Sequence, residues 1–376
     1  MITTDYRGRL RQLVLQPTPF CNLDCRYCYL PDRSNKALMP AEVLDAAFRL
    51  VSEAGLPAER LDVRWHAGEP LVAPVDFYAS AFDRAERVLG GQTRIEHSLQ
   101  TNGVLIDRAW AEFLTERGVR VGVSIDGPAD IHDAHRTTRK GAGTLEAVMR
   151  GVAVLQEHAI PFDVIAVVSS VTMTHADRFM EFFEGLKGMR QLGLNIEETE
   201  GDHASATFAS DGFEARCLAF MQRVQAWSSR TGIRVREFEA MKDLIVLGDE
   251  RGARNTQNEP FAILAIACDG QICTFSPELL GLRHPNWESF SIGHVHSSSM
   301  ADLLKSKRLL DLGSQINEGT DMCRRSCPYF ALCGGGAPVN KLYENGTFAS
   351  TQTRHCRSTV MTVANIVMED LEAKIS

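Results

Sequence analysis

The chain has 376 residues, of which 44% are hydrophobic and 23% charged, which is the composition of an ordinary globular protein with ample chain for a large core. The net charge of −8 and the pI near 5.8 provide no basic field for a phosphate backbone, so we expect no nucleic-acid partner. No uninterrupted apolar stretch approaches the length of a membrane span, and residues 1–5 hold no apolar signal core, so we expect a cytoplasmic protein without a membrane partner.

Short apolar strands alternate with amphipathic helices from residue 13 to residue 196. The expected strands are 13–16, 61–65, 94–99, 119–123, 162–168 and 191–196. The expected helices are 40–50, 75–89, 107–117, 144–158 and 175–186. Six strands that alternate with helices imply a parallel sheet with βα crossovers, and therefore an α/β fold.

Unusual polar segments follow the first four strands, at the point where each strand gives way to a loop. They are Cys21–Cys28, Gly68-Glu69-Pro70, Thr101-Asn102-Gly103 and Ser124–Gly127. In (β/α) barrels, this end of the strands is where catalytic groups gather. We therefore expect the four segments to converge on one site.

Cys21, Cys25 and Cys28 have the spacing C-x3-C-x2-C. Because ten cysteines in a reducing compartment favour metal ligation over disulfides, we interpret the three as ligands of an iron–sulfur cluster. Such clusters usually take four thiolates, yet the next cysteine is Cys217, so one iron would keep an open position, as catalytic metal sites do. Zinc is the competing ligand, although its expected spacings come as C-x2-C pairs.

A bridge of two helices, residues 211–247, leads to a second region that contains most of the cysteines. A hairpin is expected at residues 263–273, with Asp269-Gly270 as its turn. Further on, four cysteines without a histidine fit either an all-thiolate zinc site or a fully ligated 4Fe–4S cluster, and their spacing does not decide between these. These four are Cys323, Cys327, Cys333 and Cys356. We expect domains at 1–210, 211–255 and 256–376.

The first cysteine loop, with Tyr27 just before its last cysteine, resembles the signature of the radical S-adenosylmethionine (SAM) enzymes. The resemblance implies a partial (β/α)6 TIM-like radical SAM barrel, in which the open iron of a 4Fe–4S cluster binds the amino and carboxylate groups of SAM. An electron, supplied by a donor such as flavodoxin or ferredoxin, then cleaves SAM and releases a 5′-deoxyadenosyl radical.

The same resemblance implies contacts between particular residues and SAM. Glu69 matches the carboxylate that accepts hydrogen bonds from the methionine ammonium, and Arg136 matches the arginine whose fork of donors pairs with the SAM carboxylate. For Asn102 and Ser169, cofactor contact competes with an ordinary polar role in a loop. The implied cofactor-binding residues are Tyr27, Gly68, Glu69, Pro70, Asn102, Ser124, Asp126, Arg136 and Ser169. We interpret His66, His132 and His135 as satisfied polar residues rather than bases.

The second region resembles a SPASM domain, the auxiliary-cluster extension of many radical SAM peptide maturases. Members with two auxiliary clusters have a further cysteine shortly after the position of Cys333, where this chain has Gly334–Ala337. The resemblance therefore implies one auxiliary 4Fe–4S cluster, held by Cys323, Cys327, Cys333 and Cys356. Cys268 and Cys273 are packing residues or support a partial site, and Cys217 lies in an apolar helix stripe as a buried thiol.

Segments 195–201, 273–281, 333–341 and 344–346 resemble the cyclophane-forming radical SAM/SPASM maturases, including those paired with glycine-rich-repeat precursor peptides. The implied partner is a ribosomally made precursor peptide. The implied reaction removes a Cβ hydrogen, and the carbon radical then attacks an aromatic ring to form a C–C crosslink. An auxiliary cluster would accept the surplus electron. One of Glu197, Glu198 and Glu200, after the sixth strand, would act as the base, unless these carboxylates bind the peptide or are solvated.

Other functions remain open from the sequence. Oxidation of a Cys or Ser side chain to formylglycine, or thioether crosslinking, would share the first half of the chain. The missing cysteine after Cys333 counts against formylglycine formation. A non-catalytic iron–sulfur or zinc scaffold, or an electron carrier, is the alternative of a different class.

Overall fold

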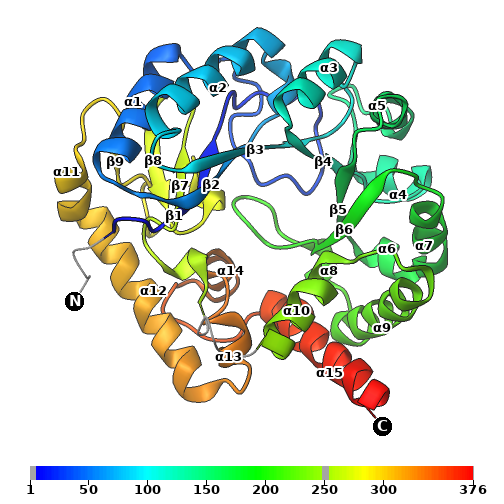
Figure 1. Ribbon diagram of the computed structural model, residues 1–376. Helices are drawn as coiled ribbons and strands as arrows, with labels where there is room; N and C mark the ends of the chain where they lie inside the picture. The colour runs from blue at the N-terminus through cyan, green and yellow to red at the C-terminus, as the bar shows by residue number, and fades with distance from the viewer. Residues whose placement is uncertain (1–5, 248–253, 376) are drawn as a thin grey trace.

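The computed structural model describes residues 6–247 and 254–375 (Figure 1). Residues 1–5, where we expected no signal core, and residues 248–253 of the expected bridge lie outside the described residues. The first part of the chain alternates strands with helices. Its strands are β1 (Leu10–Leu15), β2 (Pro57–Trp65), β3 (Arg94–Thr101), β4 (Arg120–Ser124), β5 (Phe162–Val168) and β6 (Met189–Ile196). Its helices are α1 (Ala41–Glu53), α2 (Val75–Leu89), α3 (Arg108–Arg117), α4 (Ala129–His135), α5 (Leu145–Glu157), α6 (Ser170–Thr174) and α7 (Ala176–Glu184), with a 3₁₀ turn η1 (Pro70–Val72).

These six strands are parallel and lie in the order β6-β5-β4-β3-β2-β1. They curve around a centre, with the helices on the outside (Figure 1), so the predicted α/β fold is confirmed. The register places Leu15 beside Trp65 and Trp65 beside Leu99. Because neighbouring strands end at the same level, the loops that follow them open at one edge of the sheet.

The helices that sequence periodicity predicts have clear local causes. α2 covers the expected residues and buries Tyr78, Phe82 and Ala85 against the sheet. α3 begins where the carboxylate of Asp107 accepts a hydrogen bond from the backbone N–H of Trp110 at 3.0 Å, which satisfies a free donor of the first turn. The expected helix 175–186 is preceded by a separate short helix, α6.

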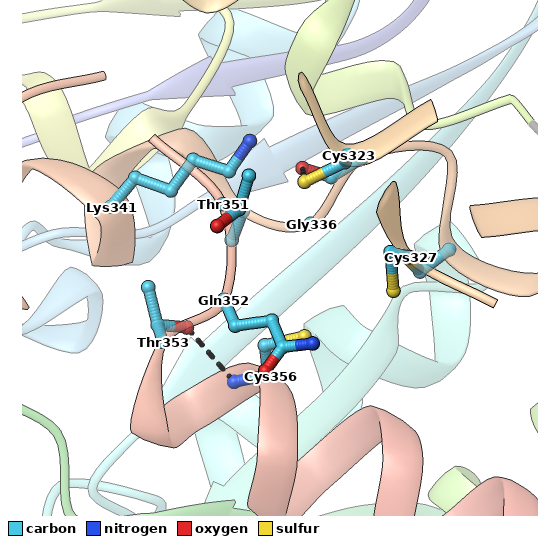
Figure 2. Close-up of a pocket in the computed structure, with 11 residues that line it drawn as sticks. Cys323, Cys327, Gly336, Lys341, Thr351, Gln352, Thr353 and Cys356 are labelled. Carbon is cyan, nitrogen blue, oxygen red and sulfur yellow. Dashed lines mark hydrogen bonds between the residues drawn. The ribbon is translucent and has the colours of Figure 1, made fainter. Parts of the chain in front are cut away.

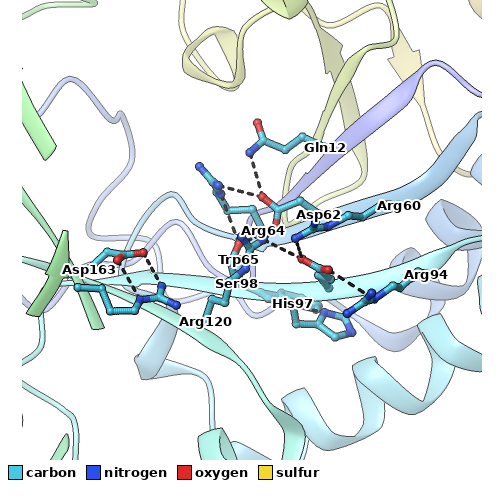
Figure 3. Close-up of polar contacts among 12 residues, drawn as sticks. Gln12, Arg60, Asp62, Arg64, Trp65, Arg94, His97, Ser98, Arg120 and Asp163 are labelled. Atoms are coloured by element: carbon cyan, nitrogen blue, oxygen red, sulfur yellow. Dashed lines mark hydrogen bonds and ion pairs between the residues drawn. The ribbon is translucent and has the colours of Figure 1, made fainter. Parts of the chain in front are cut away.

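Alternate residues of β2 face opposite sides of the sheet. Leu61, Val63 and Trp65 are buried, whereas Asp62 and Arg64 face a polar network on the other side. Figure 3 shows this network, in which the Asp62 carboxylate accepts hydrogen bonds from Arg64 (2.9 Å), Ser98 (2.8 Å) and Arg120 (3.0 Å). The concave side of the sheet is therefore polar, and Arg64 connects this network to the cavity described below.

The remaining elements follow β6. They are α8 (Ala206–Ala209), α9 (Phe213–Thr231), α10 (Arg236–Leu247), η3 (Thr256–Asn258), β7 (Ile263–Ile266), β8 (Gln271–Thr274), η4 (Pro277–Leu279), β9 (Gly293–His294), α11 (Met300–Lys305), α12 (Lys307–Ser326), α13 (Phe330–Cys333), α14 (Pro338–Asn345), the π-helical turn η5 (Cys356–Met361) and α15 (Thr362–Ile375). The predicted hairpin is present as β7 and β8, which pair antiparallel.

The second region continues the sheet of the first. β7 pairs parallel with β1, where Leu13 lies beside Leu264 and Leu15 beside Ile266, so the sheet has nine strands within the described residues. The division at residues 210 and 255 remains a prediction, but the two regions share this sheet. In the described part of the chain, no helix combines the length and apolar character needed to cross a bilayer.

Candidate active site and a second cysteine centre

A cavity of about 550 Å³ lies at the edge where the parallel strands end. Cys21, Cys25 and Cys28 line it, as do residues from the loops after β2, β3, β4 and β6. The other predicted site residues that line it are Tyr27, Gly68, Glu69, Asn102, Ser124, Arg136, Glu197, Glu198 and Glu200. The sequence-based expectation that the polar segments converge therefore agrees with the geometry.

Glu69 is fixed beside the cysteine loop by backbone geometry. Gly68 has φ +77°, and a Cβ there would lie 2.2 Å from the carbonyl oxygen of Thr18, so only glycine fits. The backbone N–H of Glu69 donates to the Phe20 carbonyl at 2.8 Å. Its carboxylate is 2% exposed and accepts hydrogen bonds from the backbone N–H groups of Leu71 and Asn102 and the hydroxyl of Thr101. Burial raises the pKa of Glu69, and these hydrogen bonds oppose the shift.

Asn102 joins two parts of the cavity wall. Its backbone N–H donates to Glu69 at 2.8 Å, and its side-chain amide donates to the side chain of Asn22 at 2.7 Å. Since Asn22 lies directly after Cys21, Asn102 holds the carboxylate loop and the cysteine loop together. The structure therefore gives Asn102 a positioning role at the cavity.

Asp126 lies behind Tyr27 and Arg136 rather than in the cavity lining. Its carboxylate accepts hydrogen bonds from the Tyr27 hydroxyl at 2.5 Å and from Nε of Arg136 at 3.0 Å. The guanidinium carbon of Arg136 lies 5.3 Å from the centre of the Tyr27 ring, within range of a cation–π contact. Asp126 thus orients two side chains that do line the cavity.

Three other predicted cofactor residues have clear local contacts. Ser169 does not line the cavity; it caps α6, where its hydroxyl accepts a hydrogen bond from the backbone N–H of Thr172. Pro70 begins η1, and its carbonyl accepts a hydrogen bond from the Tyr78 hydroxyl at 2.7 Å. Ser124 does line the cavity, where it accepts a hydrogen bond from Gln100 at 3.0 Å.

The histidines near the cavity differ from one another. Nδ1 of His132 accepts from the backbone N–H of Asp126 at 3.2 Å, and Nε2 lies 3.1 Å from the Thr144 hydroxyl, so His132 is satisfied as expected. Nδ1 of His66 and Nε2 of His135, by contrast, are buried and have no hydrogen-bond partner within residues 6–247 and 254–375. Burial lowers the pKa of His66 and of His132 to about 4, so both rings are neutral near pH 7.

The first cysteine trio suits a cluster. Burial raises the pKa of Cys21 to about 12 and that of Cys25 to about 11, so binding of iron must displace their protons. In residues 6–247 and 254–375, no three His, Cys, Asp or Glu side chains converge on the position of a single metal ion. The thiolates of a 4Fe–4S cluster bind different irons around a shared space, and three thiols around one cavity fit that arrangement.

The three predicted base candidates have different partners. Glu197 is in contact with His203 at 3.1 Å and accepts a hydrogen bond from the Thr207 hydroxyl. Glu198 accepts a hydrogen bond from Asn340 at 2.5 Å and lies 3.1 Å from Nδ1 of His355. Glu200 is 8% exposed, and its Oε1 is buried without a hydrogen-bond partner among the residues that the structure describes.

Glu200 lies in an acidic environment. Burial raises its pKa well above the ordinary value, and the nearby carboxylates of Glu278 and Glu198 add to the shift. Glu278, in η4, lines the same cavity, but its position far along the chain gives no sequence signal that it belongs there. Asn340 and His355, also unassigned from the sequence, line the cavity as well.

The four cysteines of the second region lie around one small pocket, part of which Figure 2 shows. Cys323 is in the last turn of α12, Cys327 follows that helix, Cys333 ends α13 and Cys356 begins η5. The structure therefore brings together four thiols that span 34 positions of the sequence, from 323 to 356. An all-thiolate set of four fits a fully ligated 4Fe–4S cluster.

Gly334, Gly335 and Gly336 shape this second centre. They have φ values of +62°, +108° and +71°, which allow the chain to fold back so that the N–H groups of Gly335 and Gly336 lie near the Cys333 sulfur, where they oppose the rise that burial causes in the pKa of its thiol. Asn258 secures the loop by donating to the carbonyl groups of Gly334 at 3.0 Å and Gly336 at 3.1 Å. The three glycines thus direct backbone N–H groups toward the thiol that precedes them.

The other three cysteines do not line either site. Cys217 is fully buried in α9, as expected. Cys268 and Cys273 are also buried, and the Cys273 thiol lies 3.8 Å from the carbonyl oxygen of Leu279. The packing interpretation of Cys268 and Cys273 therefore fits the structure better than a partial metal site.

The cavity and the four-cysteine pocket share a wall. Ala337 lines both, and consecutive residues divide between them: Asn340 and His355 line the cavity, whereas Lys341 and Cys356 line the pocket. Short segments of α14 and of the loop before η5 therefore lie between the two centres.

Comparison with known proteins gives three kinds of match. Residues 15–183 match the family model of the radical SAM superfamily. The chain is 37% identical to an uncharacterised protein of Synechocystis sp., over 98% of this chain and 94% of that protein. It is 25% identical to a serine-type anaerobic sulfatase-maturating enzyme of Bacteroides thetaiotaomicron, over 91% of this chain and 86% of that enzyme. The solved structure of native anSMEcpe with bound AdoMet and Kp18Cys peptide has a similar fold, with a TM-score of 0.77, 21% identity, and coverage of 96% of this chain and 98% of that one.

Proposed function

This chain belongs to the radical SAM superfamily, and from that premise we propose that it is a maturase that forms a C–C crosslink between a side-chain carbon and an aromatic ring in a ribosomally made peptide. Its cofactors are a 4Fe–4S cluster and SAM. A peptide substrate is supported by the sulfatase-maturating relative and by the peptide in the anSMEcpe structure.

The observation that carries the proposal is the composition of the cavity wall. One cavity of about 550 Å³ is lined by the three thiols, by Glu69 and Arg136, and by Glu200 with its free carboxylate oxygen. The four-cysteine pocket adjoins it through Ala337. A crosslink to an aromatic ring needs hydrogen removal, a proton acceptor and an electron acceptor. The three thiols with Glu69 and Arg136 suit the first, Glu200 suits the second, and the four-cysteine pocket suits the third.

In this proposal each side chain has a distinct task. When bound at Cys21, Cys25 and Cys28, the cluster and SAM supply the 5′-deoxyadenosyl radical that removes one hydrogen atom from the peptide. Glu69 would accept hydrogen bonds from the ammonium group of SAM, and Arg136, oriented by Asp126, would pair with the SAM carboxylate. Asn102 keeps Glu69 in register with the cysteine loop. The Tyr27 ring lines the cavity next to the guanidinium of Arg136.

The crosslinking step then balances as follows. After hydrogen removal, the peptide carbon radical forms a covalent bond with a carbon of the aromatic ring. The ring then regains aromaticity by losing one electron and one proton. Glu200 accepts the proton because its Oε1 is buried at the cavity without another partner. A cluster held by Cys323, Cys327, Cys333 and Cys356 would supply an electron acceptor. Each linkage thus removes two hydrogens from the peptide.

Formylglycine formation is a second candidate, because the Bacteroides relative is a sulfatase-maturating enzyme. Thioether formation is a third, since both would use the same hydrogen removal. The test is co-expression with a candidate precursor peptide, followed by fragmentation mass spectrometry. Loss of two hydrogens per linkage, with no fragmentation inside a ring that contains an aromatic residue, would support the C–C crosslink.

Mass alone does not separate the candidates, because conversion of serine to formylglycine also removes two hydrogens. Labelling with an aldehyde-reactive hydrazide and alkylation of free thiols therefore accompany the mass measurement. A labelled aldehyde would establish formylglycine, and the loss of one alkylatable thiol per linkage would establish a thioether. Either result, or an unchanged peptide, contradicts the C–C crosslink.

A further inference from the structure

Lys341 lies at the four-cysteine pocket in an unusual environment. Its side chain belongs to α14 and the residue is only 3% exposed. Figure 2 shows its amino end directed toward the side of the pocket where Cys323 lies. Among the described residues, no hydrogen bond or ion pair reaches this amino group. The adjacent Asn340 points to the other site, where it donates to Glu198 at 2.5 Å.

An ammonium group on a side chain with so little exposure to water favours a negative charge close by. Removal of a charged group from water is strongly unfavourable unless the group is paired. Apart from the four cysteines and Lys341, the pocket is lined by uncharged residues. These are Gly335, Gly336, Ala337, Thr351, Gln352 and Thr353. The four thiolates are therefore the available source of negative charge.

We propose that Lys341 is the counter-cation of the auxiliary cluster and raises its reduction potential, so that the cluster accepts the electron released when the aromatic ring is restored. The inference rests on the proposed function, which assigns a 4Fe–4S cluster to the four cysteines. Reduction adds one electron to a cluster that is already negative and breaks no bond. A cation close by in a low-dielectric site stabilises the reduced form more than the oxidised form.

Lys341 acts together with the backbone of the glycine loop. The N–H groups of Gly335 and Gly336 lie near the Cys333 sulfur, and N–H dipoles directed at cluster sulfurs also favour the reduced state. Backbone dipoles provide partial charges, whereas the lysine provides a full charge. Lys341 is thus a tuning residue that acts through the cluster and does not touch the peptide.

The test measures the potential of the auxiliary cluster by itself. In a protein that carries Cys21→Ala, Cys25→Ala and Cys28→Ala, only the four-cysteine centre can hold iron, and its midpoint potential is determined by an EPR-monitored redox titration. We expect Lys341→Met to make the reduction equilibrium at least tenfold less favourable, which is a shift of 59 mV to lower potential for one electron. Lys341→Arg should restore the potential because it keeps the charge. The matched control is Lys305→Met, which removes an exposed lysine from α11.

The outcomes separate the inference from the function on which it rests. Iron present with an unchanged potential in Lys341→Met would overturn the role of Lys341 and leave the auxiliary cluster in place. A Lys341→Met protein that has lost its iron would assign the lysine to cluster retention instead of tuning, and would also overturn the inference. Absence of iron, or zinc in its place, in the protein that retains Lys341 would overturn the auxiliary cluster itself.

Discussion

Neighbouring glutamates in the loop after β6 are held in different ways. Glu197 and Glu198 have partners that fix their carboxylates, namely His203 for the first and Asn340 for the second. Oε1 of Glu200 has no such partner in the described part of the chain, and burial together with the Glu278 and Glu198 carboxylates raises the pKa of Glu200. A carboxyl group with a raised pKa is a stronger base once it has lost its proton, which suits a general base.

We predict that Glu200→Gln lowers crosslink formation by about 100- to 10,000-fold, the usual contribution of a general base. Cleavage of SAM should persist, because Glu200 is not among the groups proposed to bind SAM. In the wild type, crosslinking should increase as the pH rises through the raised pKa of Glu200, and the Gln variant should lose this dependence. The measurements are product by mass spectrometry and 5′-deoxyadenosine by chromatography.

The same substitution has an opposite effect on stability. Because the pKa of Glu200 is higher in the folded protein than in the unfolded chain, the folded state binds more protons, and its stability falls as the pH rises above 4.5 toward the raised pKa. Glu200→Gln should therefore unfold at a higher temperature than the wild type at pH 7. Glu197→Gln is the control: it should destabilise, because it disrupts contacts with His203 and Thr207. Unchanged crosslink formation in the Glu200→Gln variant would exclude Glu200 as the base.

At the scale of elements, the glycine loop after α13 offers a matched pair of substitutions. Gly335 has φ +108°, and a Cβ there would lie 3.0 Å from Thr320 and 3.2 Å from Asn258. Gly336 has φ +71°, a left-handed value, and its Cβ would meet only Lys341, at 3.9 Å. A left-handed conformation costs a residue with a side chain about 1–2 kcal/mol, and a clash adds to that cost.

Gly335→Ala should therefore displace the N–H groups from the Cys333 sulfur and lower the iron bound at the four-cysteine centre, whereas Gly336→Ala should retain most of it. Iron and sulfide assays on the background without the first cysteine trio measure this difference. Equal iron in the two variants would show that the loop conformation does not control the centre.

The packing of α2 on β3 provides a second prediction at this scale. The His97 ring stacks on Phe82 with centroids 3.6 Å apart, and its Nδ1 accepts a hydrogen bond from Nε1 of Trp65 at 3.3 Å. Burial lowers the pKa of His97 to about 3, so the folded protein keeps the ring neutral where the unfolded chain would protonate it. Stability should consequently fall as the pH decreases below 6.5, by about 2 kcal/mol at pH 5.

His97→Gln removes this titration, and we predict a shallower loss of stability between pH 6.5 and pH 5. Urea unfolding at several pH values, followed by circular dichroism, gives the slope directly. His158→Gln is the control, because His158 is part-buried at the end of α5, where Nδ1 of its ring lies 2.9 Å from the carbonyl oxygen of Val154. If the free energy of unfolding changes equally with pH in the wild type and in His97→Gln, residues other than His97 cause the acid sensitivity.

Elements whose signal is local were predictable, and those that depend on distant partners were not. α2 has its expected bounds because its apolar residues recur at helical spacing. The sequence reading missed α12, although Leu309, Leu312 and Ile316 lie on its buried face, because Gly313 and Gly319 interrupt the apolar pattern there. The pairing of β7 with β1 had no sequence signal, since it joins strands about 250 residues apart.

The site shows the same division. The cysteine spacing and Gly68-Glu69-Pro70 indicated the cavity because such short segments specify their own geometry. The role of Ser169 could not be predicted, because a serine that follows a strand can equally cap a helix or contact a ligand. Glu278 and Lys341 reach their sites through tertiary packing alone, so only the structure brings them there.

At the scale of the whole molecule, two centres are joined by one sheet and one shared wall. β7 extends the barrel sheet beside β1, the strand that leads into the first cysteine loop. Ala337 separates the cavity from the four-cysteine pocket. No cysteine lines both sites, so the residues that would hold one cluster are not those that would hold the other.

We therefore predict that the two centres can be removed separately. Cys25→Ala should abolish both SAM cleavage and crosslinking, because it removes a ligand of the SAM-binding cluster, and it should leave the iron of the second centre. Cys327→Ala should lower total iron by about half and prevent crosslinking, while SAM cleavage continues without product. Iron content, 5′-deoxyadenosine and peptide mass, measured on the same samples, distinguish the two patterns. Cys217→Ser, at a thiol outside both sites, is the control and should retain full iron and activity. Crosslinked peptide from Cys327→Ala would mean that the ring transfers its electron elsewhere, and the adjoining pocket would then have only a structural role.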